Sequence, residues 1–180
     1  TILQKLEGIL AKENAQRKSI DNLLAGVGNS HKDKTTISIG WPAIEILRVE
    51  DPQQRIETRS VGSCYVIFGI NPYGDVILGH YTQRVPREMG LQLAKSLIQQ
   101  QNLQPHRQLD FNTFQFKFIP GPQNPTNPDK NSVKDSYYNV YYDRNQGLQV
   151  EKFPEPLIEA KKSFQSNKYI YSLSKILSTS

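Results

Sequence analysis

Residues 64–82 read CYVIFGINPYGDVILGHYT, and this stretch decides the fold. Two apolar segments, residues 65–70 and 76–78, lie on either side of a turn that contains Pro and Gly. β-branched and aromatic residues favour buried strands, and Pro and Gly favour a chain reversal. The pattern therefore predicts a β-hairpin. It begins next to the only cysteine of the chain, Cys64, and brings His80 back towards it.

Patterns outside this hairpin predict further strands and helices. Apolar residues at three-and-four spacing indicate helices over residues 2–25 and, after Pro86, over residues 87–101. Alternating or β-branched segments predict strands at 36–47, interrupted by Pro42, at 111–119, and in a hairpin of 137–142 with 148–153. The expected fold class is α+β, a mostly antiparallel β-sheet or sandwich with helices packed on it.

We expect three parts along the chain. Residues 1–34 form an N-terminal amphipathic helix and a polar linker, residues 35–155 a central domain, and residues 156–180 a helical extension. The N-terminal helix either packs on the body, which we favour, or binds a partner protein. A loop rich in Pro and Asn, residues 120–132, is expected to be exposed and mobile. The missing initial Met suggests a trimmed chain or a piece of a longer protein.

Composition argues against several classes of protein. The chain is 37% apolar and 22% charged, as in soluble globular proteins. Its net charge of +5 comes from scattered Lys and Arg, so no nucleic-acid partner is expected. No apolar run approaches the roughly 20 residues of a membrane span, and no signal peptide is visible. A single cysteine without a Cys/His cluster argues against structural zinc and disulfides. We expect a cytoplasmic protein, or one secreted into a host cell as an effector.

Cys64 is a candidate nucleophile. A thiol is only slightly ionised at neutral pH, so it needs a base within hydrogen-bonding reach, and the hairpin offers His80. The preceding turn includes Gly62 and Ser63. Backbone N–H groups of this turn could bind the oxygen of a substrate carbonyl as an oxyanion hole. The alternatives stay open from these residues alone: Cys64 as a small buried side chain, and His80 as a hydrogen-bonded histidine of the sheet.

The combined pattern resembles a known family. Thr58-x-x-x-Gly62-Ser63-Cys64, then Asn71-Pro72 and Gly79-His80, is similar to the chemoreceptor glutamine deamidases (CheD). The deamidase domains of cytotoxic necrotizing factor toxins look like distant relatives. The resemblance covers about residues 37–150, although Asn-Pro replaces the usual Asp-Pro turn. It implies a CheD-like fold and a Cys-His-Thr triad in which Thr58 orients His80.

The resemblance implies a bacterial protein-glutamine deamidase, a cysteine-dependent amidohydrolase that converts a glutamine side-chain amide to glutamate. Cys64, His80 and Thr58 would be the catalytic residues, with backbone groups of Gly62 and Ser63 at the oxyanion. Neither a metal nor an organic cofactor is expected, and the partner is a protein that bears a reactive glutamine. Two alternatives remain: a secreted toxin or effector that deamidates a host protein, and a non-catalytic protein-binding module on the same fold.

Overall fold

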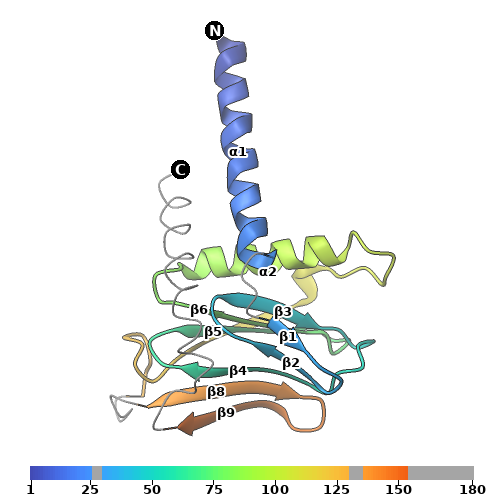
Figure 1. Ribbon diagram of the computed structural model, residues 1–180, viewed down its shortest axis with the longest axis vertical. Coiled ribbons are helices and arrows are strands. Elements are labelled where there is room, and N and C mark those ends of the chain that lie inside the picture. The colour runs from blue at the N-terminus through green and yellow to red at the C-terminus, as the bar shows by residue number, and fades with distance from the viewer. Residues whose placement is uncertain (26–29, 130–135, 154–180) are drawn as a thin grey trace.

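The computed structural model describes residues 1–25, 30–129 and 136–153, which form two β-sheets and two α-helices (Figure 1). The five-stranded sheet has the order β1 (Ser30–Lys32), β2 (Thr36–Ile39), β4 (Arg55–Val61), β8 (Tyr137–Asp143) and β9 (Gly147–Phe153). The four-stranded sheet has the order β3 (Ala43–Leu47), β6 (Val76–Tyr81), β5 (Tyr65–Ile70) and β7 (Gln115–Pro120).

The predicted fold class, α+β with mostly antiparallel sheets and packed helices, is confirmed. In the described chain only β2 and β4 pair in parallel. The predicted central hairpin is β5 with β6, in a register that sets Val66 opposite His80. The hairpin of β8 with β9 also forms, and α2 (Arg87–Gln101) has the predicted bounds.

Three strand predictions differ from the structure. Residues 36–47 form two strands in different sheets, β2 and β3, and the chain passes between the sheets at Trp41–Pro42. Proline lacks the N–H that a strand ladder needs, so one strand cannot continue through it. Part of the predicted linker is β1, which pairs with β2. The segment predicted as a strand from Phe111 begins with the 3-10 helix Phe111–Thr113, and β7 follows.

The apolar core has two layers, one on each side of the four-stranded sheet. The layer between the sheets contains side chains from β2, β4, β5, β6 and β8, among them Ile37, Ile56, Val66, Leu78 and Val140. The layer beneath α2 contains Ile44, Ile67, Ile77, Leu93 and Leu97. The two faces of β5 and β6 therefore have different neighbours, and residues that share a face with Val66 and Leu78 point towards the five-stranded sheet.

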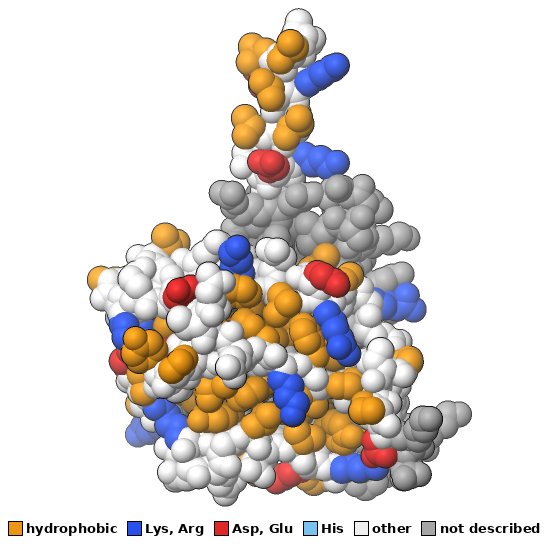
Figure 2. All heavy atoms as spheres, turned by 180° about the vertical axis from the view of Figure 1, so that it is seen from behind, with side chains coloured by type: hydrophobic (Ala, Val, Ile, Leu, Met, Phe, Trp, Pro, Cys, Tyr) orange, Lys and Arg blue, Asp and Glu red, His pale blue; other side chains and the backbone are white. Residues whose placement is uncertain are grey.

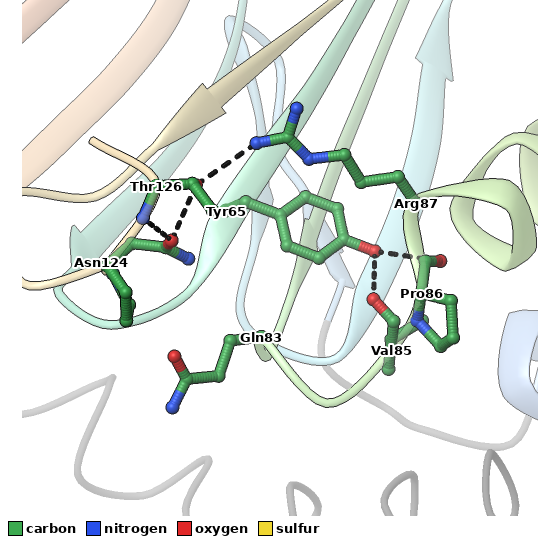
Figure 3. Close-up of a pocket in the computed structure, with 8 residues that line it drawn as sticks. Tyr65, Gln83, Val85, Pro86, Arg87, Asn124 and Thr126 are labelled. Atoms are coloured by element: carbon green, nitrogen blue, oxygen red, sulfur yellow. Dashed lines mark hydrogen bonds between the residues drawn. The ribbon is translucent and has the colours of Figure 1, made fainter. Parts of the chain in front are cut away.

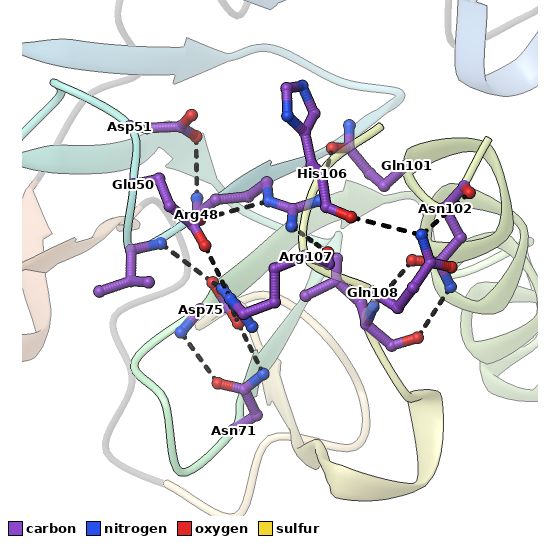
Figure 4. Close-up of polar contacts among 12 residues, drawn as sticks. Arg48, Glu50, Asp51, Asn71, Asp75, Gln101, Asn102, His106, Arg107 and Gln108 are labelled. Atoms are coloured by element: carbon purple, nitrogen blue, oxygen red, sulfur yellow. Dashed lines mark hydrogen bonds and ion pairs between the residues drawn. The ribbon is translucent and has the colours of Figure 1, made fainter. Parts of the chain in front are cut away.

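Buried polar contacts hold the turn of the central hairpin (Figure 4). Asp75 is fully buried, and its carboxylate accepts hydrogen bonds from Arg107 Nη2 at 2.7 and 2.9 Å. The same carboxylate accepts from Asn71 Nδ2 at 2.8 Å and from the amide of Val49 at 2.9 Å. Because these contacts join the hairpin to the chain beyond α2, the turn is tied to the body of the domain and does not depend on local propensity alone.

The helix α1 (Ile2–Ala25) has the predicted bounds but projects away from the body (Figures 1 and 2). Apolar side chains over its first ten residues are largely exposed, and Ile2 is 79% and Leu6 52% exposed. The expectation that this helix packs on the body is therefore wrong for residues 2–10. Among the residues described, neither helix combines the length and the apolar character that a bilayer-crossing segment needs.

The prediction of an exposed loop at 120–132 is wrong for its first residues, whereas Pro125, Thr126, Pro128 and Asp129 are exposed as predicted. Gly121, Pro122 and Asn124 are buried. A Cβ on Gly121 would lie 2.0 Å from the carbonyl oxygen of Gly62, so only glycine allows this approach of the two backbones. The loop therefore packs directly on the turn that precedes Cys64. The predicted extension 156–180 lies outside the described residues.

Candidate functional site

The structure joins two of the three predicted catalytic residues. Thr58, on β4, and His80, on β6, belong to different sheets, and Thr58 Oγ1 lies 2.7 Å from His80 Nδ1. Their side chains are 1% and 0% exposed. This hydrogen bond crosses the layer between the sheets and fixes the orientation of the imidazole ring. The proposed role of Thr58, to orient His80, requires a contact of this kind.

Cys64 lies on the same face of the four-stranded sheet as His80. The residue that pairs with His80 is Val66, and Cys64 stands two residues before it, so both side chains point towards the five-stranded sheet. Cys64 packs in the layer between the sheets, at 8% exposure. It is a diagonal neighbour of His80, and Cα atoms in such pairs are about 7–8 Å apart.

The contact between the thiol and the imidazole is not formed. His80 Nε2 is buried and has no hydrogen-bond partner among the described residues. Cys64 Sγ therefore makes no hydrogen bond with Nε2, although both belong to one face. Catalytic hydrogen bonds are often longer before substrate binds and tighten in the reacting complex. An unpartnered buried nitrogen also costs free energy, which a proton donor placed at Nε2 would recover.

Burial keeps both groups neutral. Desolvation raises the pKa of the Cys64 thiol to about 12 and lowers the pKa of His80 to about 3. A thiol and an imidazole with these pKa values do not exchange a proton at neutral pH. The pair can therefore act only if proton transfer accompanies attack on a substrate; a thiolate–imidazolium pair does not exist beforehand.

A distortion of β4 separates Thr58 from the turn that carries Cys64. The register between β4 and β8 shifts between Thr58 and Val61, and Ser60 has a positive φ of 59°. The amide of Ser60 donates to Asn139 Oδ1 at 3.0 Å, which satisfies this irregular position. β-bulges of this kind bend a strand and redirect the chain, and they are frequent beside functional sites. Here the chain leaves the five-stranded sheet after Val61 and enters the other sheet at Tyr65.

Loop residues that the sequence did not single out hold the turn at Gly62 and Ser63. The amides of Gln123 and Gly121 donate to the carbonyls of Gly62 and Cys64 at 3.1 and 2.9 Å. Asn124 Nδ2 donates to the Ser63 carbonyl at 2.9 Å. Each of these hydrogen bonds uses a carbonyl of the turn as acceptor, so none of them occupies its N–H groups. This arrangement is compatible with the predicted oxyanion role, which needs N–H groups to face the substrate.

The only tryptophan of the chain is a further neighbour of His80 that the sequence analysis missed. The Trp41 ring lies 6.2 Å from the His80 ring, centroid to centroid, with 34° between the planes. Trp41 is partly exposed, whereas His80 is fully buried. The indole therefore lies next to the buried imidazole and has part of its own surface exposed to solvent. One sequence signal could have indicated this neighbour of His80. The single Trp stands directly before Pro42, where an alternating segment is interrupted.

No metal site emerges from the described ranges, since no three His, Cys, Asp or Glu side chains within them are grouped as metal ligands would be. Neither a protein-family model nor a curated protein matches the sequence significantly. The chemistry of Cys64, His80 and Thr58 must therefore be argued from their geometry.

Proposed function

We propose that the chain is a cysteine-dependent protein-glutamine deamidase related to the CheD family. The observation that carries this proposal is the Thr58–His80 hydrogen bond, which leaves a buried, unpartnered Nε2 on the face that also carries Cys64. A histidine fixed at one nitrogen and open at the other is the arrangement of a general base beside a nucleophile.

In the first half of the reaction, Cys64 Sγ attacks the side-chain carbonyl carbon of glutamine while its proton passes to His80 Nε2. This transfer requires the tautomer in which Nδ1 carries hydrogen and donates to Thr58 Oγ1, since Nε2 must then hold a lone pair. The carbonyl π electrons move onto oxygen, where N–H groups near Ser63 and Cys64 stabilise the oxyanion. The intermediate collapses, the C–N bond breaks, and the proton on Nε2 leaves with the amine as ammonia.

In the second half, water attacks the thioester and gives a proton to Nε2. The C–S bond breaks, the proton returns to sulfur, and the product is a glutamate side chain. Every proton in this cycle passes through one nitrogen, and the hydrogen bond to Thr58 holds the ring that carries it in one orientation. Chain residues supply all the groups of this scheme.

Burial of the site has a consequence for the substrate. With Cys64 8% exposed and His80 inaccessible, a glutamine side chain reaches the sulfur only if the covering residues move. Trp41 lies next to His80 and is partly exposed, so we assign it the role of a cover over the site. A protein segment that displaces it would bring its glutamine to Cys64 and open a path for the water that hydrolyses the thioester.

The experiment that tests this function uses a pool of glutamine-containing peptides and the full chain. Ammonia release and conversion of the glutamine amide to the acid are followed by coupled assay and by mass spectrometry. Wild type should convert a subset of peptides, whereas Cys64→Ser and His80→Gln should not. Wild type that converts none of the peptides, or Cys64→Ser that converts them as fast as wild type, would contradict the proposal.

Exposed apolar side chains on α1 favour a second function, protein binding without turnover. Leu3, Leu6 and Leu10 are each more than half exposed, and such exposure on a projecting helix is typical of an interaction surface. A binding module would keep Cys64 as core filling. Full retention of partner binding by Cys64→Ser, together with an absence of deamidation by wild type, would favour this second function.

A further inference from the structure

A cavity of about 240 Å³ lies beside the turn that carries Cys64 (Figure 3). Its lining comes from Tyr65 at the start of β5, from the chain before α2, from Arg87 at the first position of α2, and from loop residues that include Asn124 and Thr126. Arg87 is the one charged residue among them. The cavity is thus a neutral hollow with a single cation at its edge.

Hydrogen bonds connect this cation to the candidate nucleophile. Arg87 Nη2 donates to Thr126 Oγ1 at 3.1 Å, and the Thr126 hydroxyl donates to Asn124 Oδ1 at 2.7 Å. Asn124 Nδ2 in turn donates to the Ser63 carbonyl at 2.9 Å and contacts the Cys64 carbonyl at 3.4 Å. The cavity and the nucleophile turn therefore share one rigid support, and Asn124 belongs to both.

Arg87 retains most of its capacity to bind an anion. The guanidinium lies over the Phe118 ring, 5.0 Å from its centroid, and its one hydrogen bond among the described residues goes to a neutral hydroxyl. Within the same part of the chain, no Asp or Glu forms a salt bridge with Arg87. A guanidinium has five N–H donors in a planar fork that matches a carboxylate, so at least two remain for a bidentate contact.

We propose that this cavity binds an acidic side chain of the protein substrate, close in sequence to the glutamine that Cys64 attacks. The inference rests on the proposed deamidase function and adds a chemical preference to it. An Asp or Glu of the substrate pairs with Arg87 at the exposed rim of the cavity, while Val85, Pro86 and Pro125 offer apolar surface to the rest of that side chain. The shared support through Asn124 sets the distance between the bound carboxylate and Cys64.

The test measures binding apart from turnover. Labelled short peptides, acetylated and amidated so that they carry no terminal charge, contain one central glutamine and either Glu, Gln or Lys at a flanking position. Their affinity for full-length Cys64→Ser protein is measured by fluorescence anisotropy. For at least one flanking position, the Glu peptide should bind about tenfold more tightly than the Gln peptide.

Variants at Arg87 assign that preference to the cavity. In the same Cys64→Ser background, Arg87→Gln should abolish the preference, Arg87→Lys should retain part of it, and Arg87→Glu should favour the Lys peptide. Lys95→Gln, which removes one positive charge as Arg87→Gln does but from another exposed position on the same helix, should leave the preference intact. Thermal unfolding confirms that each variant is folded.

Equal affinity for the Glu and Gln peptides would overturn the inference. An equal loss of preference in Arg87→Gln and Lys95→Gln would also overturn it, because the effect would then report overall charge. An absence of binding by every peptide would overturn it as well. Failure of the deamidase proposal has a different signature: wild type binds acidic peptides through Arg87 but releases no ammonia from them.

Discussion

Thr58 Oγ1 and His80 Nδ1 lie 2.7 Å apart and join the two sheets of the domain through a buried hydrogen bond. The side chains around Thr58 on this face of β4 and of the adjacent strands are apolar. They include Ile37, Ile56 and Val140. A hydroxyl in such a layer needs a partner, and the imidazole provides it. This hydrogen bond therefore stabilises the fold and also orients the imidazole ring. Paired substitutions at Thr58 separate these two effects.

Replacement of Thr58 by Val keeps the shape of the side chain and removes the hydroxyl. Deamidation should fall about 100-fold, because His80 loses the partner that fixes its tautomer and orientation. Thr58→Ser retains the hydroxyl and should keep most of the activity. The measurement is the initial rate of ammonia release under saturating peptide. Equal rates for Thr58→Val and Thr58→Ser would exclude an orienting role for this residue.

The buried histidine should make the fold sensitive to mild acid. Burial lowers the pKa of His80 from 6.5 to about 3, so below pH 6.5 the unfolded chain binds a proton that the folded chain does not. Stability should therefore fall as the pH decreases from 6.5 towards 3, by about 1.4 kcal/mol for each pH unit from this group. Urea unfolding over this range measures it.

The matched control for this pH dependence is a second histidine. His80→Gln should flatten the decline between pH 6.5 and 3, whereas His106→Gln, at an exposed position, should reproduce the wild-type slope. A wild-type slope in His80→Gln would assign the acid sensitivity to other groups.

Gly121 should tolerate no side chain. A Cβ there would lie 2.0 Å from the Gly62 carbonyl oxygen and 2.9 Å from that of Val61, so the loop or the Cys64 turn must shift. Gly121→Ala should reduce the free energy of unfolding by about 1–3 kcal/mol and lower activity further than this loss explains. Gly8→Ala, with no atom within 4 Å of the added Cβ, should have no such effect. Wild-type activity in Gly121→Ala would mean that the turn need not hold this position.

The projecting helix should contribute little to the stability of the isolated chain. Leu6 is 52% exposed, so Leu6→Ala should change the free energy of unfolding by less than about 0.5 kcal/mol. Leu93 is fully buried on the inner face of α2, so Leu93→Ala should reduce the free energy of unfolding by about 2–5 kcal/mol. Denaturant unfolding of the two variants provides the comparison. A large loss in Leu6→Ala would show that α1 packs against another surface in solution.

Local patterns were sufficient for the hairpin that carries His80 and for the helix that follows it, but not for β4, which carries Thr58. The β5–β6 hairpin and α2 could be predicted because their signals, apolar runs, a Pro-Gly turn and a helix-opening Pro86, lie within each segment. The placement of β2 and β3 in different sheets could not, because it depends on which strands pair at long range. The same limit applies to α1, whose apolar pattern says nothing of whether a partner surface is available.

Within the site, the residue types of the triad were visible in the sequence but their geometry was not. The approach of Thr58 to His80 depends on the packing of two sheets, which no spacing in the chain specifies. Asn124 was hidden in a loop whose composition is typical of exposed segments, and its role arises from a fold-back onto Ser63. Burial of Cys64, which raises the pKa of its thiol to about 12, is likewise a property of the whole layer.

Selective labelling of Cys64 tests most directly whether its thiol is a nucleophile assisted by His80. A peptide in which a diazoketone analogue replaces the glutamine side chain is mixed with the native full chain near neutral pH, and intact mass and peptide mapping locate the adduct. One adduct at Cys64, suppressed by excess glutamine peptide and absent in His80→Gln, is the predicted result. No adduct on native protein, although iodoacetamide modifies Cys64 after denaturation, would contradict the account and leave the thiol as core filling.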